Sequence, residues 1–316
     1  MAKLALWGST ALEVYRHADE ALPLAGCPAD ADLADYAPIA PSLRYLAHCL
    51  PWLSTPFHVA VFSTQQRRNL KDARCHIVAE SVAKIDFFRV ASGIVAPSPE
   101  IAYLQASARR SQEALVLEGT ELCGCYALDP TSQALLEREP LTTIERLRRA
   151  AANHRDIGGC AAAKRALPWL VENAASPREA VLALLLSLPN HRGGYGLPKP
   201  CLNHSIDLGV LAGRVADKSY YVADLCWPEA RLIVEYDSDE FHLASSHLAS
   251  DANRRMALND RGYRLITVTR LQLNSAQEMD RVALALARAL ACPIRFRVAH
   301  FPDRQATLRT ALGLPH

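Results

Sequence analysis

The segment 220–237 reads YYVADLCWPEARLIVEYD and decides the fold of the C-terminal part of the chain. Aromatic and β-branched residues are frequent in Tyr220–Cys226 and Leu232–Asp237, so each stretch is predicted to form a strand. Pro228 and Glu229 lie between them and predict a tight turn. We therefore expect two antiparallel strands joined by this turn.

The elements on either side of this hairpin complete a predicted α/β fold. Ser176 followed by Pro177 and Glu179 is typical of a capped helix start, and the apolar helix ends before Pro189. The other predicted elements are strand Ser205–Leu211, helix His247–Asp260, strand Tyr263–Thr269 and helix Ala276–Leu290. The order is helix, three-strand meander, helix, strand, helix, and we expect the last strand to add in parallel after a helical crossover.

The first half of the chain predicts a separate α+β domain. A length of 316 residues suggests two domains at roughly 100–200 residues each. We predict an α+β domain at 1–140, a helical connector at 141–175 and the α/β domain at 176–316. Strands are expected at 58–63, 75–79 and 87–90, and helices at 98–110, 113–122, 142–151 and 159–174.

Composition excludes few classes of protein. Hydrophobic residues make up 50% and charged residues 22%, which is ordinary for a globular protein. The net charge of +2 is too small to identify a nucleic-acid-binding protein. Arginine clusters are either solvated helix faces or phosphate contacts, and they occur at Arg67-Arg68, Arg109-Arg110, Arg146/Arg148/Arg149 and Arg254-Arg255.

The nine cysteines and the absence of long apolar runs predict a cytoplasmic protein. An odd number of scattered cysteines without a secretion signal favours reduced thiols. Cys123 and Cys125 lack a second pair at zinc-finger spacing, so we expect a buried thiol pair. No apolar run approaches the ~20 residues that span a bilayer, and no membrane partner is expected.

Three carboxylates are predicted to meet at one end of the sheet. Asp224 lies near the end of one strand, and Glu235 and Asp237 are two apart on the next, where side chains share a face. Like charges in a partly buried place resist ionisation, and a divalent cation removes that penalty. Oxygen ligands favour Mg²⁺ or Mn²⁺. The alternative is a strand end whose acids are solvated.

Further candidate residues flank this group, and each has a structural alternative. Glu179 is either a helix-capping residue or a catalytic acid, and the two roles are compatible. His242 is either a general base or phosphate contact, or a loop residue. Asp251 and Arg254 are three apart on a helix, which favours an ion pair, but Arg254 could instead face a phosphate.

An ordered series of motifs over roughly residues 170–290 resembles one family, the PD-(D/E)XK nucleases similar to very-short-patch-repair endonucleases. The series is Ser176-Pro177-x-Glu179, Pro198-x-Pro200, Ala223-Asp224-Leu225-x-Trp227-Pro228-Glu229, Val234-Glu235-Tyr236-Asp237 with His242, Asp251-x-x-Arg254-x-x-x-Leu258 and Gly262-Tyr263-Arg264. The resemblance implies a restriction-endonuclease-like core and metal-dependent cleavage of DNA.

The same resemblance implies roles for single residues. Asp224 and Glu235 resemble the metal ligands, Glu179 the acid of the first core helix, and His242 a histidine near the attacking water. Two positions depart from the family: Asp237 stands where Lys is more common, and Ser238 where relatives tend to have Gly.

The N-terminal half resembles type IV abortive-infection antitoxin-like regulators through the segment Val95–Leu117, VAPSPEIAYLQASARRSQEALVL. This second resemblance implies a regulatory role for the first domain, and it places the chain among systems for phage defence or mobile-DNA control.

Three functional hypotheses follow. The first is a DNA endonuclease in which Asp224, Glu235 and Asp237 hold Mg²⁺ or Mn²⁺ while Arg254 and Arg255 contact the DNA backbone. The second is a non-catalytic DNA-binding regulator or antitoxin-like protein with a decayed nuclease fold. The third is a protein active only with a defence-system partner. A homodimer would suit cleavage of both strands.

Overall fold

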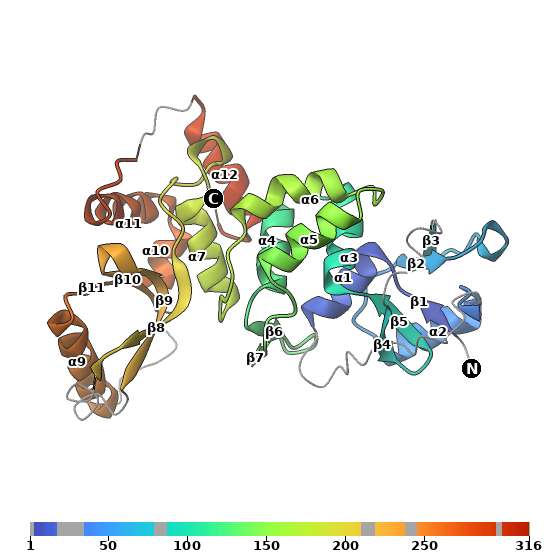
Figure 1. Ribbon diagram of the computed structural model, residues 1–316, viewed down its shortest axis with the longest axis horizontal. Helices are drawn as coiled ribbons and strands as arrows, with labels where there is room; N and C mark the ends of the chain where they lie inside the picture. Colours follow the sequence, from blue (N-terminus) through green and yellow to red (C-terminus); the bar gives the residue numbers. More distant parts are fainter. Residues whose placement is uncertain are drawn as a thin grey trace. The chain divides into compact units, whose positions relative to one another are not determined.

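The computed structural model describes residues 3–17, 35–78, 87–209, 219–237, 245–294 and 299–315, with the side chains of 245–251 excluded. The chain forms two compact units, Met1–Pro168 and Trp169–His316 (Figure 1). The boundary lies inside the predicted connector at 141–175. Helices α5 (Ile144–Asn153) and α6 (Cys160–Ala166) both pack on α3 (Pro99–Ala106). Helix α6 also packs on α4 (Gln112–Leu122). Most of that connector therefore belongs to the N-terminal unit.

The N-terminal unit has the predicted mixture of helices and small sheets. Strands β1 (Leu4–Ala5), β5 (Ile94–Pro97) and β4 (Phe87–Ala91) form one sheet in that order. Strands β2 (Phe57–Val61) and β3 (Ala73–Ile77) pair in parallel, and β6 (Tyr126–Leu128) pairs antiparallel with β7 (Leu135–Glu137). Helices α1 (Gly8–Arg16) and α2 (Ala40–Cys49) complete the unit.

The C-terminal unit contains one four-stranded sheet in the order β11-β10-β9-β8. Its strands are β8 (Cys201–Asp207), β9 (Tyr220–Trp227), β10 (Leu232–Asp237) and β11 (Arg264–Thr269). β8, β9 and β10 are antiparallel neighbours, and β11 pairs in parallel with β10. The predicted meander and the parallel fourth strand are therefore confirmed.

Five helices accompany this sheet within the described part of the unit. They are α7 (Pro177–Ser187), α9 (Ser245–Asp260), α10 (Arg270–Asn274), α11 (Ala276–Ala289) and α12 (Phe301–Ala311). Helix α9 is the crossover between β10 and β11. It ends at Asp260. Gly262 follows with a φ of +77°, the left-handed conformation that glycine adopts at low cost, and the Tyr263 N–H donates to Leu258 O as in a Schellman motif.

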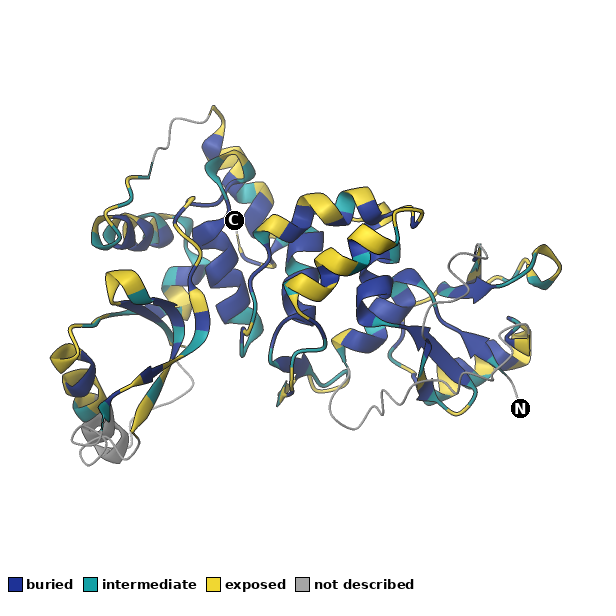
Figure 2. Ribbon diagram, in the orientation of Figure 1, coloured by how far each residue is buried: buried dark blue, intermediate teal, exposed yellow. Residues whose placement is uncertain are grey.

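Helix α7 is the central helix of this unit because it is buried on all sides from Glu179 to Ser187 (Figure 2). Its run VLALLLS has no polar face, which explains its weak amphipathic pattern. Ser176 caps the helix by accepting a hydrogen bond from Glu179 N. The burial of α7 fixes the position of its first turn, and therefore of Glu179, against β8 and β9.

Two predicted boundaries were wrong. The helix predicted at 159–174 ends at Ala166 and continues only as a 3-10 turn at Leu167–Trp169, because Pro168 has no N–H for a helical hydrogen bond. The strand predicted at Ser205–Leu211 runs from Cys201 to Asp207 instead. The prediction also missed α12 and the short strands β1, β5, β6 and β7.

Candidate functional site

The site lies where the pairing of β9 and β10 ends. The ladder joins Leu232 to Trp227, Ile233 to Cys226 and Val234 to Leu225, so the next pair in register is Glu235 and Asp224. At that point the Tyr236 N–H donates to Asp224 Oδ2 at 2.8 Å rather than to a strand carbonyl. The side chain of Asp224 thus closes the ladder, and the two predicted carboxylates come together.

Burial makes this pair electrostatically costly. Burial, reinforced by the nearby charge of Glu179, raises the pKa of Asp224 to about 7. Burial, reinforced by the charge of Asp224, raises the pKa of Glu235 to about 8. The two carboxyl groups therefore cannot both be ionised near neutral pH without a compensating positive charge.

Glu235 has one carboxylate oxygen without a partner. Its carboxylate is held by the Tyr221 hydroxyl and the backbone of Asp224. Its Oε1 is nevertheless buried and has no hydrogen-bond partner within the described residues. A buried oxygen in this state costs free energy unless a ligand or ion completes it.

Glu179 belongs to the same group and also caps α7. Its carboxylate accepts hydrogen bonds from Ser176 Oγ at 2.8 Å and from Ala175 N–H at 2.9 Å. Its charge contributes to the raised pKa of both Asp224 and Glu235. The two roles considered for Glu179 are thus compatible, because the capping geometry points its carboxylate toward the pair.

Asp237 is the most exposed of the three predicted carboxylates. Asp237 lies at the exposed end of β10, opposite Thr269 of β11. Besides burial, the charge of Glu179 raises the pKa of Asp224, and the charges of Asp224 and Glu179 raise that of Glu235. His242, Ser238 and the side chain of Asp251 lie outside the described residues.

Sequence reasoning missed two residues of the site, Tyr221 and Asn203. Burial raises the pKa of Tyr221, and so does the carboxylate of Glu235 that its hydroxyl contacts. Asn203 has a φ of +48° in the middle of β8, at the register position across from Asp224. Its Nδ2 donates to Asn173 O and to Glu179 Oε2. A polar residue of this type is the one most tolerant of positive φ after glycine.

The two predicted nucleic-acid contacts face different surroundings. Arg254 and Arg255 are both exposed on α9. The charge of Arg254 acts on the hydroxyl of Tyr221, so this arginine lies on the side of the carboxylates. Arg255 instead lines a shallow hollow of about 370 Å³ with Tyr263 and Thr267.

The donor set fits a divalent cation at the Asp224–Glu235 pair. No three His, Cys, Asp or Glu side chains within the described ranges are grouped closely enough to hold a metal ion by themselves. Mg²⁺ does not need three, since it usually takes one or two carboxylates and completes its shell with water and substrate phosphate. Such a cation would coordinate the unpartnered Oε1 of Glu235 and would lower the two raised pKa values.

Comparisons with known proteins do not identify a family. No family model matches the chain, and no solved structure matches it. The chain is 27% identical over 145 residues to two proteins of Mycobacterium tuberculosis, one from strain H37Rv and one from strain CDC 1551 / Oshkosh, both described as uncharacterized. The match covers 43% of this chain and 49% of each relative, so the chain spans about half the length of the relatives it matches. None of the described helices is long and apolar enough to cross a membrane.

Proposed function

We propose that the C-terminal unit is a divalent-metal-dependent nuclease that hydrolyses phosphodiester bonds of DNA. The observation that carries this proposal is the buried pair Asp224 and Glu235, whose pKa values are raised and whose Glu235 Oε1 has no hydrogen-bond partner among the described residues. Strongly perturbed carboxyl groups held together at a strand end are typical of functional sites.

The arrangement of α7, the sheet β8–β11 and α9 supports a restriction-endonuclease-like core. In this interpretation α7 supplies the first acid, the β9–β10 hairpin supplies the pair, and α9 returns the chain to the parallel strand β11. A chain built for stability alone gains nothing from a buried carboxyl group beside two half-buried ones, because each must be desolvated against the charge of the others.

Asp224 and Glu235 would hold Mg²⁺ or Mn²⁺. When bound, the cation acts as a Lewis acid for the scissile phosphate and lowers the pKa of the attacking water. The Tyr236 N–H fixes Asp224 through Oδ2, which leaves its other oxygen for the ion. The Tyr221 hydroxyl orients Glu235. These contacts hold both ligands before substrate arrives, which is the preorganisation that catalysis needs.

Glu179 and the arginines of α9 complete the proposed site. Glu179 is held rigidly by Ser176 and Ala175 and adds negative charge beside the pair, which increases the affinity for a cation. Arg254 lies on the same side as Tyr221 and would neutralise charge on the DNA backbone, with Arg255 further along the helix. Such phosphate contacts give binding that weakens with salt.

The direct test is cleavage of supercoiled plasmid by the full-length protein in Mg²⁺, in Mn²⁺ and in chelator. We expect nicking or linearisation only with metal, and its loss in Glu235→Ala. Glu229→Gln is the matched control, because Glu229 is an exposed acid in the turn of the same hairpin. Full cleavage by Glu235→Ala would contradict the assignment.

A second candidate function is a DNA-binding regulator or antitoxin-like protein that does not cleave. It is favoured by position 237, where an exposed Asp stands in place of the lysine that the resemblance leads one to expect. The C-terminal unit has two lysines in its sequence, and one of them, Lys199, donates from Nζ to Leu170 O at 2.8 Å. This candidate predicts salt-sensitive DNA binding with no turnover in either metal, alone or with a defence-system partner.

A further inference from the structure

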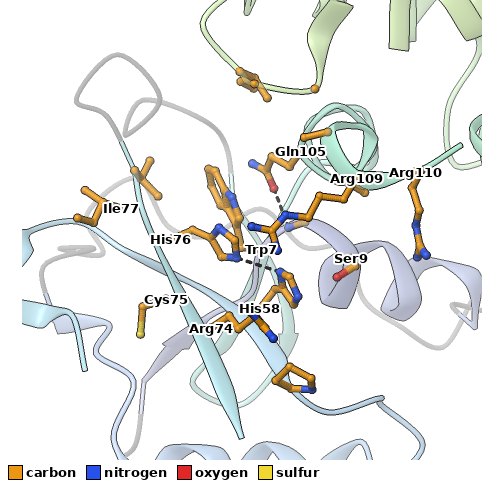
Figure 3. Close-up of a pocket in the computed structure, with 18 of the residues that line it drawn as sticks. Trp7, Ser9, His58, Arg74, Cys75, His76, Ile77, Gln105, Arg109 and Arg110 are labelled. Atoms are coloured by element: carbon orange, nitrogen blue, oxygen red, sulfur yellow. Dashed lines mark hydrogen bonds between the residues drawn. The ribbon is translucent and has the colours of Figure 1, made fainter. Parts of the chain in front are cut away.

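A second concave site lies wholly within the N-terminal unit and is lined by basic side chains (Figure 3). It is a pocket of about 830 Å³ between the pair β2–β3, the first turn of α1, the end of α3 and the turn before α6. A neighbouring hollow of about 770 Å³ shares Arg67, Arg74, His76 and Arg109 with it. We call the two together the arginine cleft.

The described lining of this cleft is strongly basic, with Asp156 as its one acidic residue. Arg67, Arg74 and Arg109 are exposed, and none of them forms an ion pair with a carboxylate in the described part of the chain. Arg110, on the same rim, does pair with Glu118 at 3.1 Å. Three unpaired guanidinium groups around one hollow repel one another, so an anion would stabilise them.

Two stacked histidines form the floor between these arginines. His76 Nε2 and His58 Nδ1 are 2.9 Å apart, and the rings stack with centroids 4.9 Å apart. Figure 3 shows Arg74 and Arg109 on either side of His58. Burial lowers the pKa of His58. Burial, together with the charge of His58, lowers the pKa of His76 to about 4. The charges of Arg74 and Arg109 lower both pKa values further.

The neutral histidine pair leaves ring nitrogens for a ligand. Each neutral ring carries one N–H, and one of the two is used between the rings. The other N–H therefore lies on an outer nitrogen, either His58 Nε2 or His76 Nδ1, and can donate to a ligand. The backbone of His58 is held in place, since its N–H donates to Thr10 Oγ1 at 2.8 Å and the Trp7 N–H donates to its carbonyl oxygen at 2.9 Å. Arginine forks and imidazole nitrogens at fixed positions are the usual donors to phosphate oxygens.

From this geometry we propose that the arginine cleft binds phosphate groups of a nucleotide ligand, either a free nucleotide or part of a nucleic-acid strand. Three guanidinium groups match a multiply charged anion better than a single carboxylate. The volume exceeds that of a phosphate, and the half-exposed Ile77 and the partly exposed Trp7 line the same pocket, where a base could stack. The site is separate from the carboxylate pair and does not depend on nuclease activity.

The test measures binding by the full-length protein in the presence of chelator, so that no cleavage occurs. The probes are inorganic phosphate, adenosine triphosphate and fluorescently labelled single- and double-stranded oligonucleotides. The test variant is Arg74→Gln with Arg109→Gln. The matched control is Arg148→Gln with Arg149→Gln, two exposed arginines of α5 that do not line the cleft.

We expect the test variant to weaken binding of at least one nucleotide probe by about tenfold or more, the loss typical of a charge-assisted hydrogen bond, and the control to bind like the wild-type protein. Weakening for adenosine triphosphate identifies a free nucleotide, and weakening for oligonucleotides alone identifies a strand. Equal affinity of test and control variants, both with wild-type unfolding temperatures, would overturn the proposal. So would the absence of binding by every probe.

Discussion

The carboxylate pair of the C-terminal unit and the arginine cleft of the N-terminal unit both concentrate like charges, but they do so in opposite ways. Asp224 and Glu235 are half-buried, and their pKa values rise toward neutrality. Arg67, Arg74 and Arg109 are exposed, and the groups whose charge is suppressed are the histidines beneath them.

The difference follows from the chemistry of the two side chains. A carboxyl group avoids the cost of burying its charge by taking up a proton. A buried pair can therefore exist without metal and release its protons when a cation binds. A guanidinium group cannot be deprotonated in a protein, so a cluster of arginines must stay in contact with water. The buried site is therefore suited to a small ion, and the exposed one to a large anion.

The largest expected effect separates the two sites by function. Glu235→Gln removes a charge from the proposed metal site. We expect plasmid cleavage to fall by more than about a hundredfold, because loss of a metal ligand should cost more than loss of a residue that only orients a ligand. Oligonucleotide binding in chelator should stay unchanged, because the arginine cleft is intact. Loss of binding together with cleavage would show that the two sites are not independent.

The next effect concerns stability and pH. The folded state holds the protons of Asp224 and Glu235 more tightly than the unfolded chain, in which carboxyl pKa values are about 4. Their stabilising contribution is thus complete below about pH 4 and is lost as pH rises through about 7 and 8. Without metal, the free energy of unfolding should fall between about pH 5 and pH 9, by roughly 7 kcal/mol at most.

Denaturant unfolding monitored across this pH range checks the prediction. Glu235→Gln should flatten the dependence, because an amide does not titrate, and Mg²⁺ should stabilise the wild-type protein more at the alkaline end. A wild-type profile that already matches Glu235→Gln would show that the pair carries no raised pKa.

A smaller effect is expected for the residue that orients Glu235. Tyr221→Phe removes the hydroxyl that contacts the carboxylate but keeps the ring. We expect about a tenfold loss of metal affinity or cleavage rate, as for other groups that orient a metal ligand. A metal titration measures the change in metal affinity. The cleavage rate at saturating metal then measures any separate loss of cleavage. Tyr220→Phe, a change to the exposed neighbour on the same strand, is the control and should have wild-type values.

The smallest effect tests the backbone of β8. Asn203 has a φ of +48°, a conformation open to glycine but strained for alanine. Asn203→Ala should be less stable than Asn203→Gly by about 1 kcal/mol, although both lose the contact with Glu179. Thermal unfolding of the two variants gives this difference directly. Equal stabilities would mean that the chain relaxes to an extended conformation at this position.

Much of the C-terminal unit could be predicted from sequence because its signals are local. The capped start of α7, the aromatic and β-branched residues of β9 and β10, and Gly262 after the end of α9 are each local features of the sequence. The convergence of Asp224 and Glu235 followed from strand pairing through a short turn.

The remaining features depend on contacts between distant parts of the chain. Asp237 shares a strand face with Glu235 but lies beyond the end of the buried region, so alternation alone could not exclude it. Asn203 reaches Glu179 only because β8 packs beside the first turn of α7. The arginine cleft draws Arg74 and Arg109 from elements that sequence patterns predicted but could not place together.

One consequence follows from the hydrogen bond between Tyr236 N–H and Asp224. This carboxylate closes the β9–β10 ladder, so the fold itself requires an acceptor at position 224. Glu235 also serves the fold, since its carboxylate accepts hydrogen bonds from the Asp224 backbone and the Tyr221 hydroxyl, while its buried Oε1 satisfies no donor among the described residues. The same two acids thus join the strands and form the proposed cation site, so a change that removes either side chain should weaken the sheet as well as the binding of metal.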